Sequence, residues 1–276
     1  MPSNDNRRGK GMRSGWATTG AIAAAGLLAG LLGGWKLATG VSRQMPTTHG
    51  EWVKFTNAAG DSIRAYVAYP ERKDKAPGII VIHEIFGLTD WEPTVADKLA
   101  GAGYVAVVPD LLSPRFGTSP ADPDSGRKLT ALLAPDQVNG DLDAAYKYLG
   151  SLPSVRSDDI GTIGFCWGGG RSFAYATANR NLKAAVVCYG PPPDSTAIRA
   201  IGAHVLGVYG EDDARIDASL PDVERQMNAA KKSFRYKKYP DTGHGFLKPG
   251  RKGSDSPSVD KAWLDILGFY QEVLGK

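Results

Sequence analysis

The 276-residue sequence has little cysteine and little histidine: it contains two cysteines, Cys166 and Cys188, and four histidines. Two cysteines cannot form a disulfide framework or a cysteine-based zinc site. The strong bias of fibrous or disordered chains is also lacking, because 42% of the residues are hydrophobic, 22% are charged, and glycine and proline number 34 and 18. Length and composition therefore predict one large globular domain with a short appendage.

An excess of positive charge is missing from most of the chain. Residues 1–45 contain six lysines or arginines and one aspartate, which leaves 27 basic and 28 acidic side chains for the rest. The formal net charge of +4 therefore arises at the N-terminus. The sequence gives no indication of nucleic-acid binding by the globular part. Since it also shows no ligand cluster and no phosphate-binding loop, it predicts no metal and no organic cofactor.

The N-terminal residues have the pattern of an export signal or a membrane anchor. Residues 15–35 carry no charge and follow a basic stretch that includes Arg7 and Arg8. As a helix, this segment is long enough to span about 30 Å of hydrocarbon, which favours an anchor. The small residues at 38–40 suit a signal peptidase instead, and the arginine pair partly resembles a twin-arginine signal. Both alternatives stay open.

Either alternative places residues 46–276 on the far side of the inner membrane, because the basic residues keep the N-terminus cytoplasmic under the positive-inside rule. We therefore expect residues 1–45 to form a signal peptide or membrane anchor with a linker, in contact with the membrane or the export machinery. The following domain is expected to be periplasmic, or anchored to the inner membrane and facing the periplasm. The sequence leaves the oligomeric state open.

Short apolar runs that alternate with helical segments predict a parallel sheet. Residues 51–56 and 63–69 come first and predict a hairpin. The later runs predict six strands, at residues 78–83, 104–108, 162–165, 184–189, 204–209 and 234–239. The helical segments are residues 91–102, 136–149, 169–177, 220–232 and 258–274. This alternation specifies an α/β fold in which helices cover both faces of a mostly parallel sheet.

One segment interrupts the alternation. Residues 111–135 are rich in proline, glycine, serine and aspartate and stand between the strand predicted at residues 104–108 and the helix predicted at residues 136–149. We interpret them as a loop over the site. In sheets of this kind, ligands bind beyond the carboxyl ends of the strands, and the candidate residues below all fall there.

Residues 164–169, Gly-Phe-Cys-Trp-Gly-Gly, follow a predicted strand and open a helix. A nucleophile flanked by small residues in a strand, turn and helix is the nucleophile elbow, here with cysteine in place of serine. The small residues are required because side chains at Gly164 and Gly168 would collide in so tight a turn. We therefore identify Cys166 as the candidate nucleophile, with a helix N-terminus that favours its thiolate.

A cysteine nucleophile needs a base, and residues 241–246 place His244 in a glycine-flanked turn after the last predicted strand. The acid that orients the imidazole is expected within residues 209–216. Asp213 is the first choice and Asp212 the alternative, because the sequence does not fix which carboxylate turns inward. The order of nucleophile, acid and base along the chain is that of the α/β-hydrolases.

With these motifs, residues 50–274 resemble the dienelactone hydrolases, also called carboxymethylenebutenolidases. Cys166, Asp213 and His244 fall on the positions of that family's triad, and residues 84–87 are similar to its Glu-Ile-Phe-Gly motif. The resemblance implies an α/β-hydrolase fold and a carboxylic ester or lactone hydrolase. It also implies that Glu84 contacts the resting cysteine and helps to activate it when substrate arrives.

The resemblance further implies where the substrate is held. The backbone N–H groups of Ile85 and Trp167 would bind the oxyanion. The family holds the substrate carboxylate with two arginines, and Lys248 stands at one of these positions, four residues after the candidate base. Arg115 and Arg127, in the predicted loop, are the candidates for the second cation.

We therefore predict a hydrolase that cleaves a small-molecule lactone or carboxylic ester through Cys166. Two alternatives stay open: a broader carboxylesterase or thioesterase that uses the same residues, and a catalytically silent, membrane-tethered binding module. His83 is expected in the core or in a supporting position, not in catalysis. Cys188 is expected to be a small core residue whose geometry forbids a disulfide with Cys166.

Overall fold

The computed structural model describes residues 48–275 of the chain. The predicted signal peptide or anchor lies outside the described residues, so its nature and the location of the protein stay predictions. Within residues 48–275, no helix combines the length and the apolar character needed to cross a bilayer.

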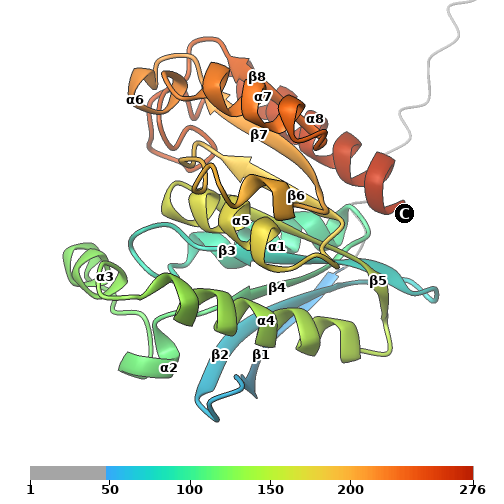
Figure 1. The fold of residues 1–276 in the computed structure, drawn as a ribbon. Helices are drawn as coiled ribbons and strands as arrows, with labels where there is room; N and C mark the ends of the chain where they lie inside the picture. Colours follow the sequence, from blue (N-terminus) through green and yellow to red (C-terminus); the bar gives the residue numbers. More distant parts are fainter. Residues whose placement is uncertain (1–47, 276) are drawn as a thin grey trace, which may run out of the picture. The chain divides into compact units, whose positions relative to one another are not determined.

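Eight strands form one sheet in the order β1-β2-β4-β3-β5-β6-β7-β8 (Figure 1). Their bounds are β1 Thr48–Thr56, β2 Ser62–Pro70, β3 Ala76–Ile82, β4 Val105–Pro109, β5 Val155–Phe165, β6 Ala184–Cys188, β7 His204–Gly210 and β8 Phe234–Tyr239. Strand β2 pairs antiparallel with β1 and β4, and all other neighbours are parallel. The predicted hairpin and mostly parallel sheet are confirmed.

Helices cover both faces of this sheet, as the sequence predicts. The long ones are α1 (Trp91–Gly101), α4 (Pro135–Ser151), α5 (Trp167–Ala178), α7 (Leu220–Ala229) and α8 (Pro257–Leu274). Helices α1 and α8 pack together, with Lys98 Nζ 4.7 Å from the centre of the Trp263 ring. Helices α4 and α5 are joined by a 2.7 Å hydrogen bond from Tyr175 to Asp143. Right-handed crossovers put these two pairs on opposite faces.

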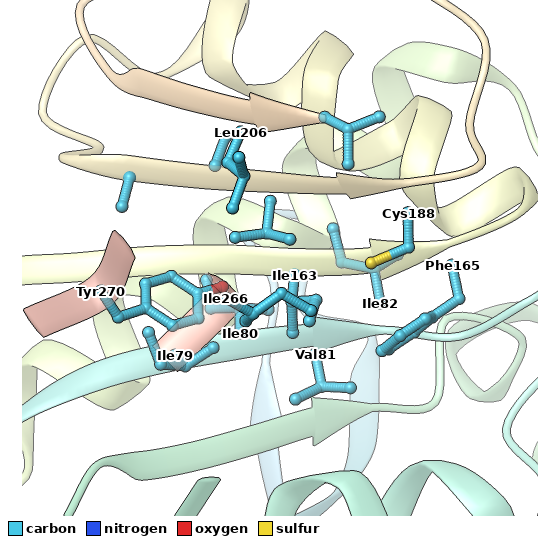
Figure 2. Packing of buried hydrophobic residues seen from close by; sticks show 14 of the residues in the cluster. Ile79, Ile80, Val81, Ile82, Ile163, Phe165, Cys188, Leu206, Ile266 and Tyr270 are labelled. Atoms are coloured by element: carbon cyan, nitrogen blue, oxygen red, sulfur yellow. The ribbon is translucent and has the colours of Figure 1, made fainter. Parts of the chain in front are cut away.

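The core lies along the central strand β3. All seven residues of this strand are buried, which requires apolar side chains on both faces of the sheet. Figure 2 shows Ile79, Ile80, Val81 and Ile82 packed against side chains of the neighbouring strands and of α8. Cys188 lies in the same cluster, fully buried, and both cysteines are free, as predicted.

The prediction that residues 111–135 form a loop is wrong. The segment contains two short helices, α2 (Ser113–Phe116) and α3 (Pro123–Thr130). The start of α3 has a physical cause: the Asp122 carboxylate accepts a hydrogen bond from the Ser125 N–H, and Pro123 occupies the first turn. Proline and aspartate suggest a loop by composition, but in this order they begin a helix.

A buried carboxylate on α4 anchors the hairpin and α2. Asp141, whose side chain is 1% exposed, accepts a 2.8 Å hydrogen bond from Asn57 in the hairpin turn and pairs at 2.5 Å with Arg115 of α2. The Arg115 guanidinium is therefore paired within the fold and holds α2 against α4. The sequence analysis names it as a candidate cation for the substrate.

Loss of this carboxylate should be costly. We expect Asp141→Ala to lower the free energy of unfolding by about 2 to 4 kcal/mol, because Arg115 and Asn57 lose their partner in a mostly dry site. The matched control is Asp124→Ala, which removes an exposed Asp–Arg pair within α3 and should cost about 0.5 kcal/mol or less. Urea unfolding of both variants measures the difference, and equal midpoints would contradict this account.

Candidate active site

Cys166 occupies a strained turn between β5 and α5. Its backbone has φ 55° and ψ −114°, a region that non-glycine residues seldom adopt. The flanking glycines are sterically required: a Cβ on Gly164 would overlap the carbonyl oxygen of Gly168, and one on Gly168 would overlap the carbonyl oxygens of Ile82 and His83. Strand, turn and helix together have the geometry of the nucleophile elbow.

The surroundings of the Cys166 thiol keep it protonated at neutral pH. Burial is the main cause of its raised pKa, and the negative charge of Glu84 is the second. The Trp167 backbone N–H, Arg215 and Arg251 lower the pKa, but they do not outweigh burial and the carboxylate. The helix N-terminus therefore favours the thiolate as the sequence suggests, yet the net effect has the opposite sign.

The structure brings His244 and Asp213 together. His244 Nδ1 lies 2.5 Å from Asp213 Oδ2, and the Asp213 side chain is 6% exposed. Asp212, by contrast, is exposed and pairs at 2.8 Å with Lys252. The Tyr189 and His244 rings pack edge to face, with 5.2 Å between ring centres. A buried carboxylate and an aromatic wall thus fix the orientation of His244.

Glu84 forms an ion pair with Lys248 beside the cysteine. Glu84 Oε2 lies 2.9 Å from Lys248 Nζ, and the two side chains are 3% and 17% exposed. The ammonium group also lies 5.0 Å from the centre of the Trp91 ring and 5.5 Å from that of Phe86. The carboxylate thus has two neighbours of different kinds: a cation that it holds and a thiol whose ionisation it opposes.

Two arginines join Lys248 around the Phe86 ring. The guanidinium carbons of Arg127 and Arg251 lie 5.9 and 5.6 Å from its centre. Arg127 is also paired with the exposed Asp124 on α3. Sequence analysis missed Arg251 and Arg215, because no spacing relative to a motif marks them; only the fold brings them near the cysteine.

The loop that carries Glu84 is held from β4. Buried Asp110 accepts hydrogen bonds from the backbone N–H and the hydroxyl of Ser119, at 2.8 and 2.6 Å. Ser119 Oγ in turn accepts the Leu88 N–H at 2.8 Å. Residues 111–135 therefore do lie against the site, but as a hydrogen-bonded segment around Ser119 followed by helix α3.

No arrangement that could hold a metal ion occurs among residues 48–275, where a group of three or more histidine, cysteine, aspartate or glutamate side chains would be needed. The chemistry available to the site is that of a thiol, an imidazole, two carboxylates and several cations. Such groups suit nucleophilic catalysis with general acid–base assistance.

Comparison with known proteins leads to one family. A protein of Salmonella typhimurium named for carboxymethylenebutenolidase is 34% identical over 235 residues, which cover 79% of this chain and 85% of the relative. A protein of the same name from Saccharolobus solfataricus is 30% identical over 256 residues, covering 79% and 97%.

Solved structures agree with these relatives. The crystal structure of a Klebsiella pneumoniae protein described as a dienelactone hydrolase superposes with a TM-score of 0.73 at 26% identity, covering 81% of this chain and 98% of that one. The model of the dienelactone hydrolase family matches residues 63–274. The chain therefore belongs to the dienelactone hydrolase family and has its α/β-hydrolase fold.

Proposed function

We propose that this family member hydrolyses a small-molecule lactone or carboxylic ester through Cys166. The observation that carries the proposal is the convergence of the elbow cysteine, the His244–Asp213 pair and the buried Glu84 at one end of the sheet. A binding module, the rival from another class, has no need of nucleophile, base and acid together. The relatives' names point the same way.

In the proposed reaction, His244 takes the proton of the Cys166 thiol, and the thiolate forms a carbon–sulfur bond with the ester carbonyl carbon. The carbonyl oxygen becomes an oxyanion, held by the backbone N–H groups of Ile85 and Trp167. Collapse of this intermediate breaks the bond to the alkoxy oxygen, which receives the proton from His244. Water, deprotonated by His244, then attacks the thioester, releases the acid and leaves the thiol restored.

A conformational step precedes this chemistry. In the structure the thiol makes no hydrogen bond to His244, and its pKa is raised, so the resting state is the neutral thiol. We propose that substrate binding turns the side chain towards the imidazole. A substrate anion that engages Lys248 would weaken the hold of this lysine on Glu84 and free the carboxylate to take part.

The cations around Phe86 support an acidic substrate. Lys248 Nζ and the Arg251 guanidinium carbon lie 5.5 and 5.6 Å from the centre of this ring, and we propose that their charges face a carboxylate on the lactone. This arrangement favours an acid-bearing lactone over the alternative of a broader carboxylesterase or thioesterase. Arg127 is a third cation of the same group, partly neutralised by Asp124.

The nucleophile and the acid can be tested together. Cys166→Ala should abolish hydrolysis of a dienelactone and of p-nitrophenyl acetate, and Asp213→Asn should reduce kcat on the order of 10³-fold, because the imidazole loses its orienting anion. Asp212→Asn is the matched control and should stay within about twofold, since that carboxylate pairs with exposed Lys252. Equal hydrolysis by Cys166→Ala and the parent would show that Cys166 is not the nucleophile, whereas no hydrolysis by either protein would favour the binding module.

The charge of Glu84 can be read from the thiol itself. Glu84→Gln removes the negative charge that raises the Cys166 pKa, so the thiolate fraction at pH 7 increases. Alkylation by iodoacetamide should accelerate roughly threefold to tenfold, because the pKa of the thiol falls when this charge is removed. The control, Glu92→Gln, changes another buried carboxylate, which is not among the groups named above as shifting the pKa of this thiol, and should leave the rate unchanged. A slower reaction in Glu84→Gln would contradict the statement that the Glu84 charge raises the pKa of Cys166.

Specificity is tested by Arg251→Met. The KM for an acid-bearing lactone should increase about tenfold or more, while the KM for neutral p-nitrophenyl acetate should not change, because only the first substrate presents a charge to this arginine. Arg235→Met, which removes an arginine paired with Glu272 between β8 and α8, is the control. An equal effect on both substrates would count against a carboxylate clamp.

A further inference from the structure

His83 is a fully buried histidine at the end of β3 that the proposed reaction does not use. Its ring contacts the Glu84 carbonyl oxygen and the Trp167 ring, next to the two proposed oxyanion donors. Sequence analysis placed it in the core or in a supporting position. The contacts of both ring nitrogens and of the ring face define a more specific role.

The hydrogen bond of His83 fixes its tautomer. Nδ1 lies 2.7 Å from the carbonyl oxygen of Glu84. A carbonyl oxygen can only accept, so Nδ1 carries the proton and donates it. Among residues 48–275 the opposite nitrogen, Nε2, has no hydrogen-bond partner. The hydrogen bond to the Glu84 carbonyl is therefore the only one that this side chain makes within the described residues.

That carbonyl belongs to the peptide unit that supplies an oxyanion donor. The C=O of Glu84 and the N–H of Ile85 share one planar trans peptide bond and therefore point in opposite directions. Holding the oxygen fixes the direction of the N–H. The Gly87 N–H reinforces the hold with a 3.3 Å bond to the same oxygen. The Ile85 N–H itself has no acceptor within the described part of the chain.

The face of the same imidazole contacts the second donor's residue. His83 and Trp167 stack with 5.5 Å between ring centres and 14° between ring planes. Trp167 is the first residue of α5, and its backbone N–H acts on the Cys166 sulfur. One buried side chain thus touches both residues whose N–H groups are proposed to hold the oxyanion.

We propose that His83 is a positioning residue that sets the geometry of the oxyanion hole. It does so by aiming the Ile85 N–H through the Glu84 carbonyl and by bracing Trp167 through ring stacking. The inference rests on the proposed function, because an oxyanion forms only if Cys166 attacks a carbonyl carbon. Since His83 touches neither the sulfur nor the base, its effect should appear only in steps that create negative charge on oxygen.

The test separates the donor from the ring. His83→Phe keeps an aromatic face for Trp167 but cannot donate, so kcat for p-nitrophenyl acetate should fall about 10- to 100-fold with little change in KM. His83→Asn places an amide N–H where Nδ1 stood and should recover most of the loss. His83→Leu is a second variant without a donor, for use if the phenylalanine variant does not fold.

Alkylation by iodoacetamide distinguishes a positioning role of His83 from a general structural defect around Cys166. Alkylation of Cys166 is a displacement at a saturated carbon and forms no oxyanion, so its rate in His83→Phe should stay within about twofold of the parent. A kcat equal to that of the parent would overturn the inference. So would an alkylation rate that falls by the same factor as kcat, because the defect would then lie in the cysteine or its surroundings.

Failure of the proposed function gives a different result. If Cys166→Ala retained ester hydrolysis in the same assay, the nucleophile would be misassigned, and the inference on His83 would fall with it. If Cys166→Ala is inactive and only the His83 variants behave like the parent, the proposed function stands and the positioning role alone is overturned.

Discussion

The tight turn at Cys166 is the constraint on which the rest of the site depends. Strand β5 can enter α5 at this angle only because glycines let the backbone of α5 approach two neighbouring strands. Gly168 packs on the end of β3, and Gly169 packs on the carbonyl oxygen of Cys188 in β6. Cys166, the proposed nucleophile, is therefore placed by main-chain packing among central strands and not by a flexible loop. This turn also fixes where α5 begins and the direction of the Trp167 N–H.

Around this fixed point, charges of both signs act on the Cys166 thiol, and with burial their net effect raises its pKa. Glu84 raises the pKa of the Cys166 thiol, while Arg215, Arg251 and a helix N-terminus lower it. The same carboxylate holds Lys248, so a change in the partner of the lysine alters the field at the sulfur. Under the proposed function, this one buried carboxylate would couple recognition of a substrate anion to ionisation of the thiol.

Much of this could be predicted from the sequence because the signals are local. Apolar runs gave the strands, and the glycine spacing around Cys166 indicated the elbow. Non-local features could not be predicted: Arg115 finds its partner Asp141 twenty-six residues away on another helix, and Arg251 meets Phe86 only after the chain has folded. The error at α3 has another cause, since Asp122 and its following proline were interpreted by composition when their order specifies a helix start.

The raised pKa of Cys166 also bears on the durability of the protein. Peroxides oxidise the thiolate far faster than the thiol, so a thiol held neutral by burial and by Glu84 is slow to form sulfenic acid. The second thiol, Cys188, is fully buried in the core and is not available to form a disulfide with an oxidised Cys166. A neutral resting thiol is thus chemically protected, which would suit the proposed cysteine nucleophile in the oxidising compartment that the predicted export signal implies.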